Sequence, residues 1–182
     1  MSAFSLIAGA VVLLGLLMVF GRILGGIYFK ARGERVITCP ESLRPAGVTL
    51  NAGHVLWTTL EGKPDLQLAS CSRWPNRQDC GQECLHQIET APEACLVRNI
   101  LIRWYAGKTC ALCHRPFGTI QWSDRKPGLL NPEHKTLEWQ DVPAASIPEV
   151  LATHQPLCWN CHVVNSMMVQ HPELLVDRSR EI

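Results

Sequence analysis

The sequence predicts an α+β protein, with one N-terminal transmembrane helix followed by a small cysteine-rich domain of short antiparallel strands and a few helices. Residues 1–21 carry no charged side chain, the 182-residue chain contains nine cysteines, and a Cys-x-x-Cys-His sequence occurs twice, at residues 110–114 and 158–162. Small domains with thin cores commonly depend on disulfides or bound metal, so this cysteine content predicts a cross-linked or metal-stabilised domain. The predicted organisation has three parts: 1–29, the transmembrane helix; 30–104, a cysteine-rich subdomain; and 105–182, a subdomain built on the two Cys-x-x-Cys pairs.

The apolar N-terminal run is long enough to cross a membrane. A helix rises about 1.5 Å per residue, so ~20 residues span a hydrocarbon core of ~30 Å. A cleaved signal peptide is the alternative, but such peptides have a basic n-region and a small-residue cleavage site, and this run has neither. We therefore expect a membrane-anchored protein.

Basic residues lie only on the C-terminal side of this run, at Arg22, Lys30, Arg32 and Arg35. The positive-inside rule then places residues 30–182 in the cytoplasm. Because that compartment keeps thiols reduced, it disfavours disulfides and favours thiolate ligation of metal. It also disfavours c-type haem, since similarity to c-type cytochromes would place the domain on the opposite side of a bacterial membrane.

Strands are predicted in the first half of the domain. Residues 36–40 form a short β-segment that ends at a cysteine and a proline, and residues 47–50 and 54–60 are rich in β-forming side chains between turn residues. Together they predict a small antiparallel unit.

A first cysteine cluster follows these strands. Residues 78–89 lack proline and suit a helix, which would place Cys80 and Cys84 one turn apart on one face. We prefer Cys39 over Cys95 as a further ligand, because Cys39 precedes a proline as many knuckle cysteines do, whereas Cys95 lies in an apolar helical pattern and is expected in the core. The preferred ligand set for this candidate site, a second zinc site, is Cys39, Cys71, Cys80 and Cys84.

The second half alternates helices and strands. A capping-box sequence at Thr90 predicts a helix over residues 90–105. Two tryptophan-bearing runs at 119–122 and 136–140 predict a hairpin. Helices are also expected over residues 146–154 and just beyond Cys161.

The two Cys-x-x-Cys pairs are the strongest functional signal in the chain. Two such pairs can close a tetrahedral zinc site, and four thiolates leave no position open for water, so the expected role is structural. The predicted ligands are Cys110, Cys113, Cys158 and Cys161. The first pair and the following Arg-Pro-Phe-Gly resemble the knuckles of zinc-ribbon and treble-clef domains, a resemblance that covers roughly residues 105–168. It implies a domain held together by zinc that presents a surface to a partner.

Two other cofactors fit the same cysteines. In a c-type haem protein each pair would form two thioethers, with His114 and His162 as the axial ligands. An iron–sulfur centre is the third alternative, since a rubredoxin-like iron uses the same four-thiolate geometry as zinc. We rank zinc first, because the predicted topology and the other five cysteines argue against haem.

Charge and motifs narrow the function. The net charge is +1 and no basic run occurs outside the membrane flank, so nucleic acid is not an expected partner. The chain has no Ser-His-Asp order, phosphate-binding glycine loop or His-Glu-x-x-His sequence, and no small-molecule substrate can be identified. The predicted function is a single-pass, zinc-binding accessory or interaction subunit with a protein partner in a membrane-associated assembly. The alternative is a membrane-anchored dihaem cytochrome acting in electron transfer.

Overall fold

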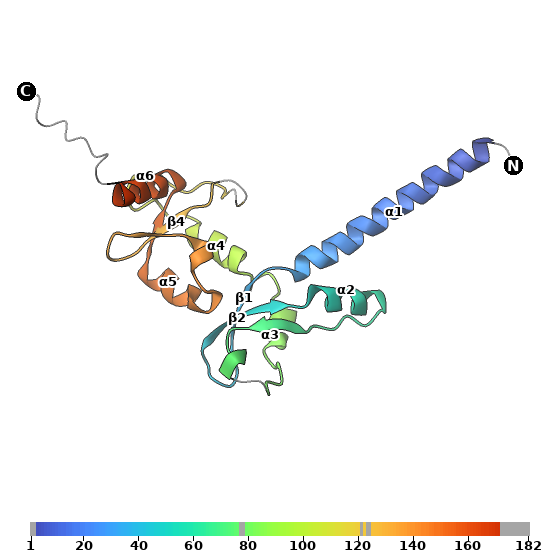
Figure 1. Cartoon of the computed structure of the whole chain (residues 1–182), viewed down its shortest axis with the longest axis horizontal. Coiled ribbons are helices and arrows are strands. Elements are labelled where there is room, and N and C mark those ends of the chain that lie inside the picture. The colour runs from blue at the N-terminus through green and yellow to red at the C-terminus, as the bar shows by residue number, and fades with distance from the viewer. Residues whose placement is uncertain (1–2, 77–78, 121, 123–124, 172–182) are drawn as a thin grey trace, which may run out of the picture.

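The computed structural model describes residues 3–76, 79–120, 122 and 125–171, and it confirms the α+β class (Figure 1). One long helix projects from two small lobes, and each lobe contains a three-stranded antiparallel sheet. The helices are α1 (Ala3–Ala31), α2 (Ala52–Leu60), α3 (Leu85–Thr90), α4 (Val97–Tyr105), α5 (Ile147–Thr153) and α6 (Trp159–Gln170), with short 3₁₀ helices η1 (Trp74–Asn76), η2 (Trp139–Asp141) and η3 (Ala144–Ser146). The strands are β1 (Arg35–Thr38), β2 (Pro45–Leu50), β3 (Leu68–Cys71), β4 (Gly128–Leu130), β5 (Thr136–Leu137) and β6 (Gln155–Leu157).

Helix α1 is predominantly apolar, and most of its length projects away from the lobes (Figure 1). Its segment Ala10–Ala31 contains an 18-residue window with a mean hydropathy of 2.3, and no residue of that window is buried in the protein. Large side chains such as Leu14 and Met18 are exposed. The predicted apolar helix is therefore present, and it is long and apolar enough to cross a membrane.

Arg35 closes the C-terminal end of α1. Its side chain is only 2% exposed, and its guanidinium donates hydrogen bonds to the carbonyls of Lys30, Ala31 and Gly33 at 2.7, 2.9 and 3.1 Å. The last carbonyls of a helix have no partner within the helix, and a cation there also complements the helix dipole. Arg35 thus fixes the exit of the chain from α1 into β1.

The N-terminal lobe is organised on the sheet β1-β2-β3. Strand β1 pairs with β2 through a tight turn, so that Thr38 lies opposite Pro45, and β2 pairs with β3. The run predicted at 47–50 lies in β2, and the β-segment predicted at 36–40 lies in β1 as far as Thr38, with Cys39 and Pro40 beyond the strand. The core of the lobe is formed by these buried side chains: Ile37, Cys39, Ala46, Val48, Leu50, Leu68, Cys84 and Ile88.

The strand predicted at residues 54–60 is wrong, because this segment is part of α2. The Asn51 side chain accepts a hydrogen bond from the amide of His54 at 3.1 Å and so caps the helix. The hydroxyl of Thr59 bonds the Val55 carbonyl one turn back. Local capping therefore overrides the β propensity of the side chains.

The C-terminal lobe packs α4, α5 and α6 around the sheet β5-β4-β6 (Figure 1). Its core centres on Tyr105, which is fully buried and whose hydroxyl bonds the Gly128 carbonyl. Trp104 and Trp139 pack edge-on against the Tyr105 ring, with centroids 4.9 and 6.0 Å away. Helix α4 thus contributes to the C-terminal core.

Three further predictions need correction. The helix predicted over 78–89 is confined to α3, and Cys80 lies in a non-helical segment before it; Gln78 lies outside the described residues. The helix predicted from Thr90 begins only at Val97, because α3 ends at Thr90 and a turn separates the two.

The predicted tryptophan hairpin is also different. Strand β5 pairs with β4, so the partner of the 136–140 run is Gly128–Leu130 and not the 119–122 run, of which residue 121 lies outside the described residues. The helices predicted at 146–154 and beyond Cys161 are confirmed as α5 and α6.

Candidate metal centre

The four cysteines of the two Cys-x-x-Cys pairs converge on one point in the C-terminal lobe. Their sulfur atoms all lie within 4.8 Å of one another. The sulfurs of Cys113 and Cys158 are 3.7 Å apart. A tetrahedral zinc with Zn–S bonds of about 2.3 Å requires sulfurs about 3.8 Å apart, whereas a disulfide bond is about 2.05 Å long. The arrangement fits four-thiolate coordination of one metal ion such as zinc.

The first pair lies on a tight turn, which we call the C-terminal knuckle (residues 109–116). The amide of Cys110 donates to the Arg115 carbonyl and the amide of His114 donates to the Cys110 carbonyl, both at 2.9 Å. Thr109 and Pro116 form an antiparallel bridge at its base. His114 has a φ of 57°, the left-handed conformation that closes the turn.

The second pair lies where α6 begins. Cys158 is the N-cap residue of α6 and directly follows β6, and Cys161 lies in the first turn. The amide of Cys158 donates to the Cys110 sulfur at 3.3 Å, and the amide of Ala111 donates to the carbonyl of Pro156 in β6 at 2.9 Å. These contacts join the knuckle to the helix start, so the two pairs face each other.

Burial and nearby backbone amides determine how readily the thiols of this site ionise. Burial acts to raise the pKa of Cys110, but the amides of Cys113, Cys158 and Leu112 face its sulfur and lower that pKa to about 6. Burial raises the pKa of Cys158 and of Cys161, and neighbouring sulfurs strengthen the effect. Four thiolates repel each other without a cation, so a bound metal ion would complete the site electrostatically.

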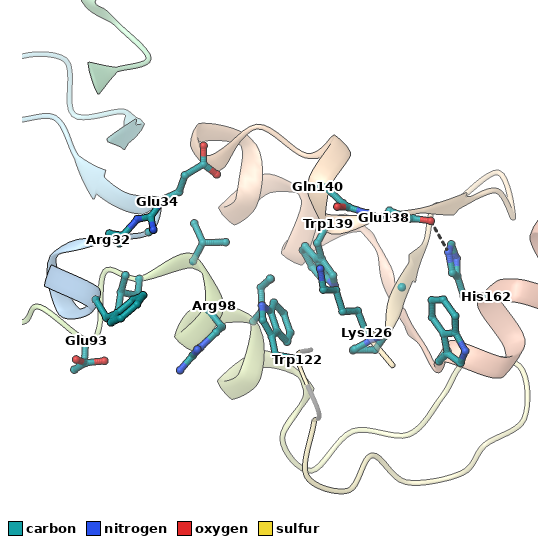
Figure 2. Close-up of a pocket in the computed structure, with 18 of the residues that line it drawn as sticks. Arg32, Glu34, Glu93, Arg98, Trp122, Lys126, Glu138, Trp139, Gln140 and His162 are labelled. Atoms are coloured by element: carbon teal, nitrogen blue, oxygen red, sulfur yellow. Dashed lines mark hydrogen bonds and ion pairs between the residues drawn. The ribbon is translucent and has the colours of Figure 1, made fainter. Parts of the chain in front are cut away.

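The two histidines that follow the cysteine pairs lie outside the sulfur cluster. His114 is exposed on the knuckle. His162 is 6% exposed, and its Nε2 lies 3.3 Å from Oε1 of Glu138 (Figure 2). A Cβ on Gly128 would come within 2.9 Å of Nδ1 of His162, so a glycine is needed there for β4 to pack on α6. His162 therefore has a packing role in this lobe.

A cavity of about 760 Å³ lies beside His162, between the foot of α1, α4 and the C-terminal lobe (Figure 2). Its walls include Arg32 and Arg98, but also Glu34 and Glu138. Charges of both signs alternate around it, so the cavity favours no single class of ionic ligand.

The predicted ligands of the second site meet at a smaller cavity in the N-terminal lobe. Cys39, Cys71, Cys80 and Cys84 all line this space of about 60 Å³. Their sulfurs are not gathered as closely as those of the C-terminal centre, which is the one such cluster among the described residues. Cys95 does not line the cavity; it packs against the core of the same lobe, as expected, with its thiol 3.7 Å from the Gln87 carbonyl.

The turn that carries Cys39 repeats the geometry of the C-terminal knuckle. In this N-terminal knuckle (residues 38–45) the amide of Cys39 donates to the Arg44 carbonyl at 2.9 Å, and the amide of Leu43 donates to the Cys39 carbonyl at 2.8 Å. Leu43 has a φ of 53°. The hydroxyl and amide of Ser42 lower the pKa of Cys39 below its ordinary value. Ser42 stands where the C-terminal knuckle has Cys113.

The sequence holds a signal of this repeat that the motif analysis missed. Residues 38–47 read Thr-Cys-Pro-Glu-Ser-Leu-Arg-Pro-Ala-Gly, and residues 109–118 read Thr-Cys-Ala-Leu-Cys-His-Arg-Pro-Phe-Gly. Five of the ten positions are identical. A search for Cys-x-x-Cys overlooks the first copy because its second cysteine is a serine. No family model matches the chain, and no curated protein or solved structure matches it either.

Proposed function

We propose that this chain is a single-pass membrane protein whose C-terminal lobe binds a structural zinc ion and serves as an interaction module of a membrane-associated assembly. The observation that carries the proposal is the convergence of Cys110, Cys113, Cys158 and Cys161 on one point. Four protein thiolates close the coordination sphere, which leaves no position for a substrate or a reactive water. Such an ion stabilises a fold and performs no chemistry.

The same convergence favours one ion over two haem groups. Each haem would require its own cysteine pair and a neighbouring histidine as axial ligand. Here both pairs share a single centre, and His162 is buried against Gly128 and Glu138. Iron in the same four-thiolate site remains the closest competitor to zinc, because the geometry is common to both metals.

Two features support attachment to a membrane. Helix α1 carries exposed apolar side chains on all its faces, as a lipid-embedded helix does. Helix α2 lies beside α1 (Figure 1) and exposes Trp57 and Leu60, with 64% and 48% of their surface accessible. Tryptophan is enriched at the membrane interface, where its ring is partly apolar and its N–H remains hydrated. We expect α2 to lie at the membrane surface.

A partner surface is available on α6, the helix that carries the second cysteine pair. It exposes these apolar residues: Val164, Met167, Met168 and Val169. Exposed methionines are adaptable contacts for protein partners, and contiguous apolar surface is uncommon on monomeric proteins. The metal would therefore stabilise the element that a partner contacts.

The metal and its ligands can be tested on the full-length protein in detergent. We expect a colourless protein from which Cys113→Ser or Cys161→Ser removes bound zinc. A sharp reduced α-band with covalently retained haem would contradict the zinc assignment, and so would visible absorption from iron. A cytoplasmic reporter fused after Ile182 should be active; activity of a periplasmic reporter alone would overturn the orientation.

The partner surface has a separate test. Met167→Glu combined with Met168→Glu should leave zinc content and thermal stability unchanged, because both side chains are exposed. On a blue native gel the unmodified protein should run as a high-molecular-mass species, and the double variant should lose that species. The control is Val11→Leu in α1, which should leave that species intact. An unchanged species in the methionine variant would exclude α6 as the contact.

A further inference from the structure

We propose that Cys39, Cys71, Cys80 and Cys84 form a second four-thiolate metal site, which binds a zinc-class divalent cation and cross-links the N-terminal lobe. The site is separate from the C-terminal centre and would hold even if the interaction role proposed above were wrong. It rests on two independent observations, a shared cavity and a repeated knuckle.

Four segments of the N-terminal lobe each place one cysteine on the wall of the same cavity. Cys39 follows β1, Cys71 ends β3, Cys80 lies in the connection after η1, and Cys84 directly precedes α3. All four are free, and Cys39 and Cys84 are buried. The space of about 60 Å³ between them can hold an ion, since a single water needs only ~10–15 Å³ by the same kind of measure. Thiolates grouped around such a space are ligands for zinc-class ions.

The repeated knuckle explains why Cys39 faces this cavity. The two turns share their backbone hydrogen bonds and the left-handed conformation of their sixth residue. They also share the strand pairing at their base, Thr38 with Pro45 and Thr109 with Pro116. In the C-terminal knuckle this geometry presents the Cys110 sulfur to the metal cluster. The N-terminal knuckle has the same backbone, and its Cys39 lines the cavity.

The other ligands also follow the C-terminal arrangement in part. Cys84 is the residue before α3, as Cys158 is the residue before α6. Because Ser42 replaces the second knuckle cysteine, the two remaining thiols come from Cys71 and Cys80. The ion would draw the four sulfurs together across the cavity, and its binding free energy would order the segment that carries Cys80.

Metal content of the full-length protein tests the site. Purified from zinc-supplemented cells, the unmodified chain should carry two zinc ions, and Cys39→Ser or Cys84→Ser should reduce this to one. Cys95→Ser is the matched control, because Cys95 packs on the same core without lining the cavity, and it should retain two. Cys161→Ser should also reduce two to one, by emptying the other centre. A zinc content that is the same in the unmodified chain and in the Cys39→Ser and Cys84→Ser variants would overturn the proposal.

A rescue separates loss of a ligand from loss of the fold. Since position 42 is equivalent to Cys113, Ser42→Cys should restore the second ion to Cys80→Ser, and the cobalt form should regain the visible bands of a tetrahedral thiolate site. Ser42→Ala should not restore it. If neither variant restores the ion while Cys80→Ser remains folded by circular dichroism, position 42 is not equivalent to Cys113 and the knuckle argument fails.

Discussion

The two knuckles share one backbone conformation, but where the C-terminal knuckle has its second cysteine, Cys113, the N-terminal knuckle has Ser42. The C-terminal knuckle supplies two thiols from a single turn, and the second pair comes from a single helix start, so four sulfurs are held within 4.8 Å of each other. The N-terminal knuckle has Ser42 at the second position, and its other candidate ligands come from three separate segments. Ligands that are close in sequence need little loop closure, whereas distant ones must be ordered by the ion itself. Local pairing is therefore what pre-organises the C-terminal centre.

The largest effect is expected from removing one ligand of the pre-organised centre. Structural zinc contributes on the order of 10 kcal/mol to folding, which is comparable to the ~5–15 kcal/mol stability of a whole domain. Cys113→Ser or Cys161→Ser should thus unfold the C-terminal lobe, measured as loss of zinc and of near-ultraviolet circular dichroism from its tryptophans. His114→Ala should keep its zinc, because His114 is exposed and outside the cluster. Zinc retained in both cysteine variants would exclude this centre.

The next largest effect concerns pH at the C-terminal centre. Burial raises the pKa of Cys158 and of Cys161, so metal binding near neutral pH must displace at least these two protons. Lowering the pH by one unit should therefore weaken the apparent affinity by at least about 100-fold. Below the Cys110 pKa of about 6 a further proton must leave, and the loss per pH unit should become about 10-fold larger.

Competition with a chromophoric chelator across this pH range would measure the slope. The direction follows from the ligand form, because the thiolate binds metal and acid favours the thiol. A pH-independent affinity would mean that the bound ion does not displace these protons.

A smaller difference in stability is expected from alanine substitutions at the equivalent glycines that follow the two knuckles, Gly47 and Gly118. A Cβ on Gly47 would lie 2.8 Å from the Ala144 Cβ and 3.1 Å from the Ala145 amide nitrogen, because β2 packs directly on η3. A Cβ on Gly118 would meet nothing within 4 Å. Gly47→Ala should therefore destabilise the protein by about 1–3 kcal/mol through overpacking, whereas Gly118→Ala should change stability by under ~0.5 kcal/mol. Chemical denaturation of both variants would check this, and equal effects would contradict the described packing of β2 on η3.

The sequence predicted features that depend on local chemistry. The apolar run of α1 and the spacing of the C-terminal cysteines are local signals, and both correspond to observed features. The knuckle at Cys39 also has a local sequence signal, but it lacks the Cys-x-x-Cys spacing because position 42 is a serine. The segment at 54–60 was misjudged because the capping bond of Asn51 decides it, and strand propensity does not reveal that bond.

Other features depend on contacts that are distant in sequence. The pairing of β4 with β6 joins residues on either side of α5. Strands of three residues are too short to show a sequence periodicity from which this pairing could be predicted. The approach of His162 to Gly128 and Glu138 is of the same kind. His162 follows a cysteine pair and so resembled a haem ligand, but its role is set by a glycine far away in the sequence. The proposed site of Cys39, Cys71, Cys80 and Cys84 likewise depends on contacts between segments that are separate in the sequence.

The smallest effect on stability is expected at the residue of each knuckle that has a left-handed backbone conformation. Leu43 and His114 have φ values of 53° and 57°, a conformation that costs a non-glycine residue about 1–2 kcal/mol. Both side chains are exposed, so replacing them loses little packing. Glycine adopts this conformation freely, but it adds about 0.5–1 kcal/mol of chain entropy to be lost on folding. Leu43→Gly and His114→Gly should each stabilise the protein by about 0.5–1 kcal/mol, by the difference of these two terms.

Denaturant midpoints of the two variants, measured on the metal-loaded protein, would test this equivalence. Similar increases are expected, because the two turns have the same hydrogen bonds and the same backbone conformation. Zinc content should not fall in His114→Gly, since the imidazole lies outside the sulfur cluster. A lower midpoint in either variant would mean that the side chain contributes more than the strained backbone costs. Loss of the metal from His114→Gly alone would instead identify His114 as a ligand and separate the two knuckles in function.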